Sequence, residues 1–139
     1  MTIKEKIENI AATHFPKCGF VCDNLYRVDE LTNTAAMPVI IVTIPESGTV
    51  TIRNNRFHDN ERVLLGFFDL APHDANGDDN SEIYNRMKTL GFAFIKKMNE
   101  SRQFEYITNI TYSVFTVRMA NIMTGVFFDI EVQDLGRCD

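Results

Sequence analysis

Cysteine is scarce in this chain, and its three copies lack the dense spacing of a small secreted domain held by disulfides. Long apolar runs are missing as well, because no uninterrupted segment reaches the length of a membrane span. No apolar run follows Lys4 and Lys6 near the start, so the sequence has no signal-peptide pattern. We therefore expect a protein that is made and kept in the cytosol unless a particle carries it out, with no membrane partner.

An excess of basic charge is also missing, since 14 basic residues face 19 acidic ones and the net charge is −5. A general nucleic-acid binder normally carries a basic footprint, so we expect no sequence-specific nucleic-acid binding. The chain has no phosphate-binding loop, dinucleotide fingerprint, nucleophile elbow or zinc-protease motif. We expect no enzymatic activity and no cofactor. An enzyme that uses a Cys–His pair formed in space stays a third hypothesis.

Two segments resemble metal sites and fail on spacing. His14, Cys18 and Cys22 lie at four-residue intervals, but a proline and a glycine break the helix that would align them. A fourth ligand is missing, with Cys138 the one other thiol, so we expect three free thiols and no zinc. The segment 74–82 has glycine at its fourth position and glutamate at its ninth, where a calcium loop needs them at the sixth and twelfth. We expect no metal.

The length of 139 residues and the 45% hydrophobic content are those of one globular domain. A first amphipathic helix is predicted from Ile3 to His14, after a capping box formed by Thr2 and Glu5. Lys6 falls on the side predicted to face water. The apolar stripe of this helix consists of Ile3, Ile7, Ile10 and Ala11.

The main helix is predicted from about Ser81 to Glu100, with Asp79 as its N-cap and Glu82 completing a second capping box. Its stripe must lie on a sheet, with Phe94 in the core. That stripe is made of Ile83, Met87, Leu90, Phe94 and Met98, widened by Tyr84, Gly91 and Ile95.

The strands are predicted from apolar runs and from alternation. Val39 to Ile44 is an unbroken apolar run, typical of a strand buried on both faces, and Arg62 to Leu70 is the next strand. A short strand at residues 20–22 stays open, and residues 23–36 are predicted as a loop. Two long strands extend from Phe104 to Asp134, with a break near residues 120–121. In the last of them, Val126, Phe128, Ile130 and Val132 alternate with polar residues.

These elements predict an α+β fold in the order α-β-β-α-β-β. The sheet is expected to be mostly antiparallel and four-stranded, with both helices packed on one face. In the first C-terminal strand, the alternation changes phase near Val114 and Phe115. Either a bulge shifts the register there, or the far half is covered on both faces. We favour burial on both faces, partly by another subunit. The interface would then include Phe115, Val117 and Met119.

The segment between Pro45 and Arg62 is predicted to be a long hairpin arm that projects from the core, because its residues are too polar to be buried. Thr49 to Arg53 continues a strand, and Asn54-Asn55 forms a turn. Long extensions of this kind are usually functional. We expect a partner to contact Arg53, Arg56, Phe57, His58 and Arg62. The three arginines put positive charge on an otherwise acidic protein.

The element order resembles that of the tail-terminator or tail-completion proteins of long-tailed bacteriophages. In that family an N-terminal helix leads into a strand that begins with proline, here residues 37–44. A long hairpin, here Pro45 to Leu70, and a helix after a polar loop, here Ser81 to Glu100, come next. Two final strands follow, here Phe104 to Asp134. The closing residues 123–132 also look like the ends of small proteins from phage structural modules in gut bacteria.

The resemblance implies a non-enzymatic virion protein. Members of the family form six-fold rings that cap the tail tube and meet the head connector. It implies homo-oligomers in the cytoplasm during assembly and in the phage tail or neck afterwards, with tail-tube and head-connector proteins as partners. An acidic strand face with Asp129, Glu131 and Asp134 suits a lumen through which DNA passes without being gripped. The alternative is a small cytosolic α+β domain that binds a ligand or a protein, with a pocket between the main helix and the sheet.

Overall fold

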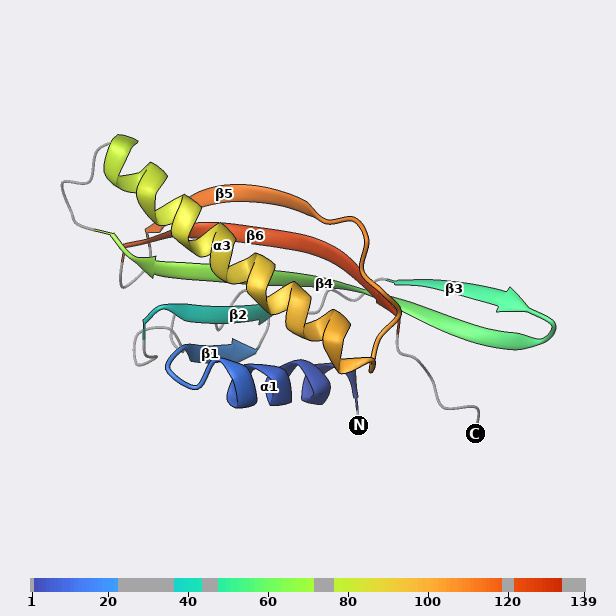
Figure 1. Cartoon of the computed structure of the whole chain (residues 1–139). Helices are drawn as coiled ribbons and strands as arrows, with labels where there is room; N and C mark the ends of the chain where they lie inside the picture. The colour runs from blue at the N-terminus through green and yellow to red at the C-terminus, as the bar shows by residue number, and fades with distance from the viewer. Residues whose placement is uncertain (1, 23–36, 44–47, 72–76, 119–121, 134–139) are drawn as a thin grey trace.

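A long antiparallel pair of strands organises the sheet in the computed structural model, which describes residues 2–22, 37–43, 48–71, 77–118 and 122–133. Only the backbone is described at 58, 59, 77–79, 115, 117, 118 and 122. The 15-residue strand β4 (Arg56–Leu70) runs the length of the molecule and lies beside β6 (Ile122–Gln133). On its other side β4 pairs with β2 (Val39–Thr43) and then, further along, with β3 (Gly48–Arg53). Figure 1 shows β4 and β6 side by side, with the other strands of the sheet around them.

The described strands form one six-stranded sheet in the order β1-β2-β4-β6-β5, with β3 joined to β4 beside β2. The edge strands are β1 (Gly19–Cys22), which runs parallel to β2, and β5 (Thr111–Arg118), which is antiparallel to β6. The α+β class and the mostly antiparallel sheet are confirmed. The predicted order and the count of four strands are wrong, because β1 and β3 are strands of the same sheet in their own right.

The two described helices, α1 (Ile3–His14) and α3 (Gly77–Ser101), lie on one face of the sheet, as Figure 1 shows. Phe94 of α3 is fully buried, with its ring centroid 5.7 Å from that of Phe67 on β4. Gly91 lets the helix approach closely, because a Cβ there would overlap the ring of Phe128. Burying each large apolar side chain here contributes about 1.5–3 kcal/mol. The predicted stripe of α3 is confirmed at Ile83, Met87, Gly91, Phe94, Ile95 and Met98.

Alternation in the last strand is confirmed: Val126, Phe128, Ile130 and Val132 are at most 2% exposed and face the helices. The opposite face carries a smaller apolar cluster of Val21, Val39, Ile41, Phe68 and Met123. Strand β2 contributes to both clusters, so its predicted burial on both faces is confirmed.

The bounds of α1 and its Thr2 cap are confirmed, since the Glu5 N–H donates to Thr2 Oγ1 at 3.2 Å. The prediction that Lys6 faces water is wrong. Lys6 is only 8% exposed, and its Nζ atom lies 5.9 Å from the ring centroid of Phe104. A lysine stem can cover apolar surface while its charge finds a ring face. The predicted N-cap of the main helix is also wrong, because α3 begins at Gly77, ahead of Asp79.

The first C-terminal strand begins at Thr111 rather than at Phe104, and its pairing with β6 is continuous from Thr111 to Arg118. No bulge therefore shifts the register within β5. The change of phase near Val114 and Phe115 falls inside this continuous pairing, so it marks neither a break nor a shift in the strand. Tyr112 and Val114 are 47% and 44% exposed, so burial of β5 on both faces does not occur within one chain.

Several predictions fall on residues outside the described ranges. These are the loop at 23–36, residues 74–76 of the calcium-like segment, the break at 120–121, Met119, Asp134 and Cys138.

Candidate protein-interaction surface

A two-stranded ribbon projects from the sheet (Figure 1) and is defined here as residues 48–59, the whole of β3 with the start of β4. The pairing of β4 with β6 begins only at Asn60 and its pairing with β2 at Leu64, so the ribbon extends past both neighbours. Asn54 and Asn55 close it with φ angles of 52° and 61°. Two consecutive positive φ angles are those of a type I′ turn, whose twist matches the strands that it joins. The predicted turn is confirmed.

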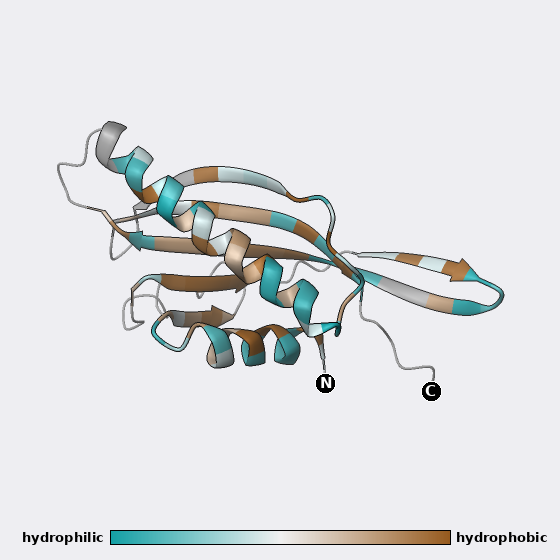
Figure 2. Cartoon of the chain, viewed as in Figure 1, coloured by the Kyte–Doolittle hydropathy of each residue, from teal (hydrophilic) through white to brown (hydrophobic). Residues whose placement is uncertain are grey.

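The ribbon has one apolar face, which the sequence-based prediction missed. Val50, Ile52 and Phe57 are 53%, 59% and 71% exposed, and Ile52 lies directly opposite Phe57 in the pairing of β3 with β4. Figure 2 shows these hydrophobic bands among the hydrophilic ones of the ribbon. The signal was present in the sequence, since Val50 and Ile52 alternate with polar residues at a period of two.

The other face of the ribbon is polar and cationic. Directly opposed residues of an antiparallel pair share a face, and Arg53 lies opposite Arg56. Both arginines are exposed, as the prediction for this segment requires, and Thr49 and Thr51 share their face. The side chain of His58, which was predicted with them, is not described.

Arg62 lies at the root of the ribbon rather than on it, and it is held by a carboxylate of its own chain. Its Nη2 atom donates to Asp129 Oδ2 at 2.6 Å, and its Nε atom donates to Oδ1 at 3.0 Å. The hydrogen bond from Arg62 holds the pKa of Asp129 below its usual range, and the same bond raises the pKa of Arg62. The sequence placed these two residues on separate surfaces, a partner interface and an acidic face. The structure brings them together.

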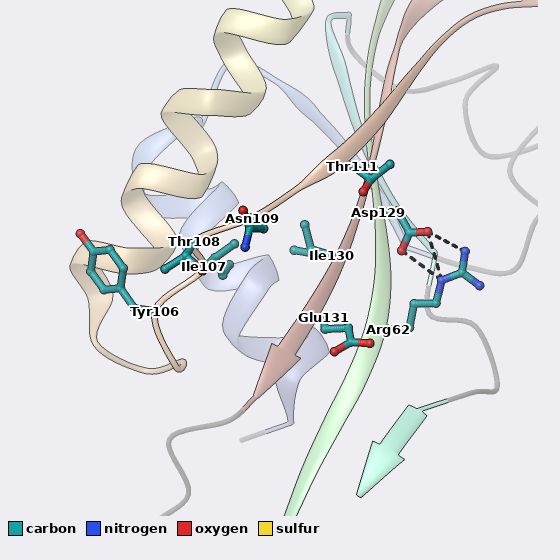
Figure 3. A pocket seen from close by; sticks show the side chains of 9 residues that line it. All are labelled: Arg62, Tyr106, Ile107, Thr108, Asn109, Thr111, Asp129, Ile130 and Glu131. Carbon is teal, nitrogen blue, oxygen red and sulfur yellow. Dashed lines mark hydrogen bonds and ion pairs between the residues drawn. The ribbon is translucent and has the colours of Figure 1, made fainter. Parts of the chain in front are cut away.

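A groove of about 460 Å³ opens beside this ion pair, where the chain leaves the edge of the sheet. The Glu105 N–H donates to the carbonyl of Gln133 at 2.7 Å, and pairing with β6 resumes only where Thr111 meets Asp129. Figure 3 shows the groove between those points, with Arg62 turned toward Asp129. The residues that line it include Arg62, Tyr106, Asn109, Thr111, Asp129 and Glu131.

The wall of the groove is fixed from behind by α3. Asn99 donates from Nδ2 to the carbonyl of Ile107 at 3.1 Å and accepts from the Ile107 N–H at 2.8 Å. These two bonds satisfy the N–H and the carbonyl of Ile107, which lies in residues 105–110, outside the described strands. The Ile107 side chain is buried. Glu131 is exposed and directly opposite Arg62 in the pairing of β4 with β6, so the floor of the groove has a carboxylate beyond the one that Arg62 holds.

The edge strand β5 has an exposed aromatic surface on the helix side. Tyr112 meets the ring of Phe128 edge-on at 6.4 Å, and Phe92 of α3 stacks on the same ring at 5.8 Å. The Nζ atom of Lys88 lies 4.5 Å from the ring centroid of Tyr112. Phe92, Tyr112 and Val114 are all more than 40% exposed. The side chains of Phe115 and Val117, which were predicted for this interface, are not described.

The described part of the chain holds no cluster of the histidines and cysteines that the sequence offers as metal ligands. No group of three or more His, Cys, Asp or Glu side chains among the described residues is arranged to hold a metal ion. Burial, with the charge of Asp69 as a second cause, raises the pKa of the Cys18 thiol. A raised pKa keeps the thiol protonated and therefore weakly nucleophilic at neutral pH.

No protein-family model and no curated protein matches this chain. Neither helix within the described ranges combines the length and the apolar character needed to span a bilayer.

Proposed function

We propose that this protein is a non-enzymatic structural subunit that assembles with copies of itself into a ring. This ring would be a tail terminator or neck component that joins a phage tail tube to the head connector. The single observation that carries the proposal is the ribbon, an amphipathic extension with its apolar face exposed at Val50, Ile52 and Phe57.

Such a ribbon needs a partner on physical grounds. An isolated two-stranded hairpin is marginally stable in water, and these three side chains stay more than half exposed in their own chain. Burial by a partner is worth about 1.5–3 kcal/mol for each fully covered side chain. The unpaired edge of β5 and its aromatic surface supply a second place where a subunit can add.

The acidic character of the chain supports the passage of DNA rather than its capture. The net charge of −5 disfavours a grip on phosphates. Asp129 contributes less than expected, because Arg62 neutralises it within the same chain. In this proposal the protein is cytoplasmic during assembly and part of the virion afterwards.

The alternative function, a small binding domain, is favoured by one observation, the groove of about 460 Å³. That volume lies within the range of small-molecule sites, about 300–1,000 Å³. Ligand sites are mostly apolar, however, and this groove is lined mainly by polar residues, among them the Arg62–Asp129 ion pair and Glu131. The space between α3 and the sheet, where a pocket was expected, is occupied by Phe67, Phe94 and Phe128, which are fully buried.

The test is the mass of the particle in solution. Light scattering coupled to size exclusion, at several protein concentrations, should give a mass that rises to a fixed multiple of 15.9 kDa, with rings visible by negative-stain electron microscopy. The substitution Phe57→Ser should lower the mass without lowering the melting temperature. The matched control, Leu70→Ser, removes another exposed hydrophobic side chain, at the end of β4 far from the ribbon, and should leave the mass unchanged. A monomer at every concentration would overturn the proposal and favour the binding domain.

A further inference from the structure

The edges of β3 and β5 are open in the described part of the fold, as is that of the short strand β1. In the part of the chain that the structure describes, β3 pairs only with β4, and β5 pairs only with β6. An open edge presents a row of backbone donors and acceptors that another strand can pair with. The edges of β3 and β5 belong to different elements, the projecting ribbon and the far side of the sheet (Figure 1).

We propose that β3 of one copy adds antiparallel to β5 of a second copy, so that one sheet continues from subunit to subunit. This inference rests on the proposed self-assembly and identifies the surfaces that carry it. The register that we propose sets Val50 beside Val114, Ile52 beside Tyr112, and Arg53 beside Thr111.

Apolar side chains meet on the helix side of the sheet in this register. Val50 and Ile52 share one face of β3, and Tyr112 and Val114 share one face of β5. With Ile52 beside Tyr112, a continuous row forms across two copies, from Phe57 through Ile52 and Tyr112 to Phe128. Cross-strand pairs of aromatic and β-branched residues are the pairs that stabilise sheets most.

Charge decides the direction of the added strand. In the antiparallel register the arginine tip of the ribbon reaches the start of β5, where Thr111 lies opposite Asp129 and the groove opens. Arg53 falls on the same sheet face as Asp129 and Glu131, and Arg56 lies beside it. Because Arg62 already holds Asp129, Glu131 is the carboxylate that remains for the incoming arginines. A parallel strand would turn Arg53 toward the other end of β5, away from the groove.

The polar faces match as well. Thr51 would lie beside Ser113 on the face away from the helices, where both are accessible. Lys88, the cation nearest to the aromatic surface, lies over Tyr112 on the helix side and so does not face the arginines. Each copy gives one ribbon and receives one, which is a heterologous contact. Such a contact closes into a ring when the rotation between copies permits it.

Disulfide trapping between two differently labelled copies tests the register. Val50→Cys on one copy and Val114→Cys on the other should cross-link under mild oxidation, because facing residues of antiparallel strands have Cα atoms about 4.5–5.5 Å apart, within disulfide reach. The matched control combines Ile52→Cys with Val114→Cys, which are two residues out of register. The wild-type protein is the background control, because it shows any cross-links that form through the native cysteines. Peptide mass spectrometry identifies the two cysteines in each linkage.

A charge exchange tests the direction independently. Arg53→Glu should weaken self-association on the order of tenfold in dissociation constant, and adding Glu131→Arg in the same chain should restore most of it. Lys4→Glu, on the exposed side of α1, should change nothing.

The outcomes separate the two proposals. A stable oligomer that cross-links equally at both cysteine pairs, or that ignores the charge exchange, overturns the register and leaves self-assembly standing. A protein that stays monomeric in light scattering overturns both. Cross-linking at residues 50 and 114 with rescue by the charge exchange supports both.

Discussion

Arg62 and Asp129, which are 67 positions apart in the sequence, form a two-pronged ion pair that joins β4 to β6 at the root of the ribbon. The side chains are 48% and 37% exposed, so water screens much of their attraction. The pair therefore serves more to orient the root of the ribbon and the floor of the groove than to stabilise the fold. It also removes one carboxylate from the acidic face.

The ion pair predicts a pH dependence with a definite sign. Folding lowers the pKa of Asp129, so the stability that it adds is fully present above its unfolded pKa of about 4. That stability is lost as the pH falls through the lower folded pKa. Asp129→Asn should lower the melting temperature slightly at pH 7, and the difference from wild type should vanish toward pH 2. A difference that grows in acid would contradict the assignment.

The core of the fold is tested at Phe94, which is fully buried and contacts Phe15 and Phe67. Phe94→Ala should lower the free energy of unfolding by about 3–5 kcal/mol, through lost burial and the cavity left behind. Phe92 provides a matched control, because it lies on the same helix and is 49% exposed. Urea unfolding of Phe92→Ala should show a clearly smaller loss, and equal losses would mean that α3 is rotated from its described position.

Asn99 is expected to hold the wall of the groove. Its side chain makes both a donor and an acceptor bond to the backbone of Ile107, and Asn99→Ala leaves those groups unsatisfied. The free energy of unfolding should fall by about 1–3 kcal/mol. Hydrogen exchange should speed up at the Ile107 amide before it changes in β6. Asn85→Ala, at an exposed site on the same helix, is the control, and equal effects of the two substitutions would show that the bonds to Ile107 contribute little.

The thiol of Cys18 is expected to react slowly with alkylating reagents at neutral pH, because burial raises its pKa. The rate should rise with pH and keep rising beyond about pH 8.5, the ordinary value for a cysteine. Peptide mass spectrometry after timed labelling of the native protein follows this cysteine separately from the others. Rapid labelling at pH 7 would indicate an activated thiolate and return the Cys–His enzyme to consideration.

Local patterns predicted the elements well, because their signals lie within a few residues. The stripe from Ile83 to Met98 and the alternation from Val126 to Val132 each required one buried face, and both were found. Long-range relationships were not predictable. Nothing near Arg62 points to Asp129, and nothing near Lys6 points to the ring of Phe104.

The candidate surface was predicted in part for the same reason. The arginines and Phe57 stood out as charged or bulky residues in a polar segment. The alternation of Val50 and Ile52 is visible in the sequence, but that they share a face with Phe57 follows only from the pairing of β3 with β4. The groove could not be foreseen, since it depends on where residues 105–110 leave β6. That departure is set by Asn99 on a different element.

The ribbon itself provides the decisive variant. Replacing residues 51–58 with a two-residue Asn-Gly turn removes strand residues that pair only with each other. It keeps Val50 opposite Asp59 and leaves the pairing of β4 with β6 from Asn60 intact. The melting temperature should stay nearly unchanged, because the removed apolar side chains are exposed in the isolated chain. Self-association, followed by light scattering, should be lost.

The control for this deletion keeps the ribbon and changes only its turn. Asn55→Gly preserves the positive φ angle that the type I′ turn requires, so both stability and self-association should remain. If the shortened protein still assembles as the wild type does, the ribbon is a surface extension without a role in assembly. If it fails to fold, the ribbon contributes to the sheet, and the division between body and ribbon at Asn60 is misplaced.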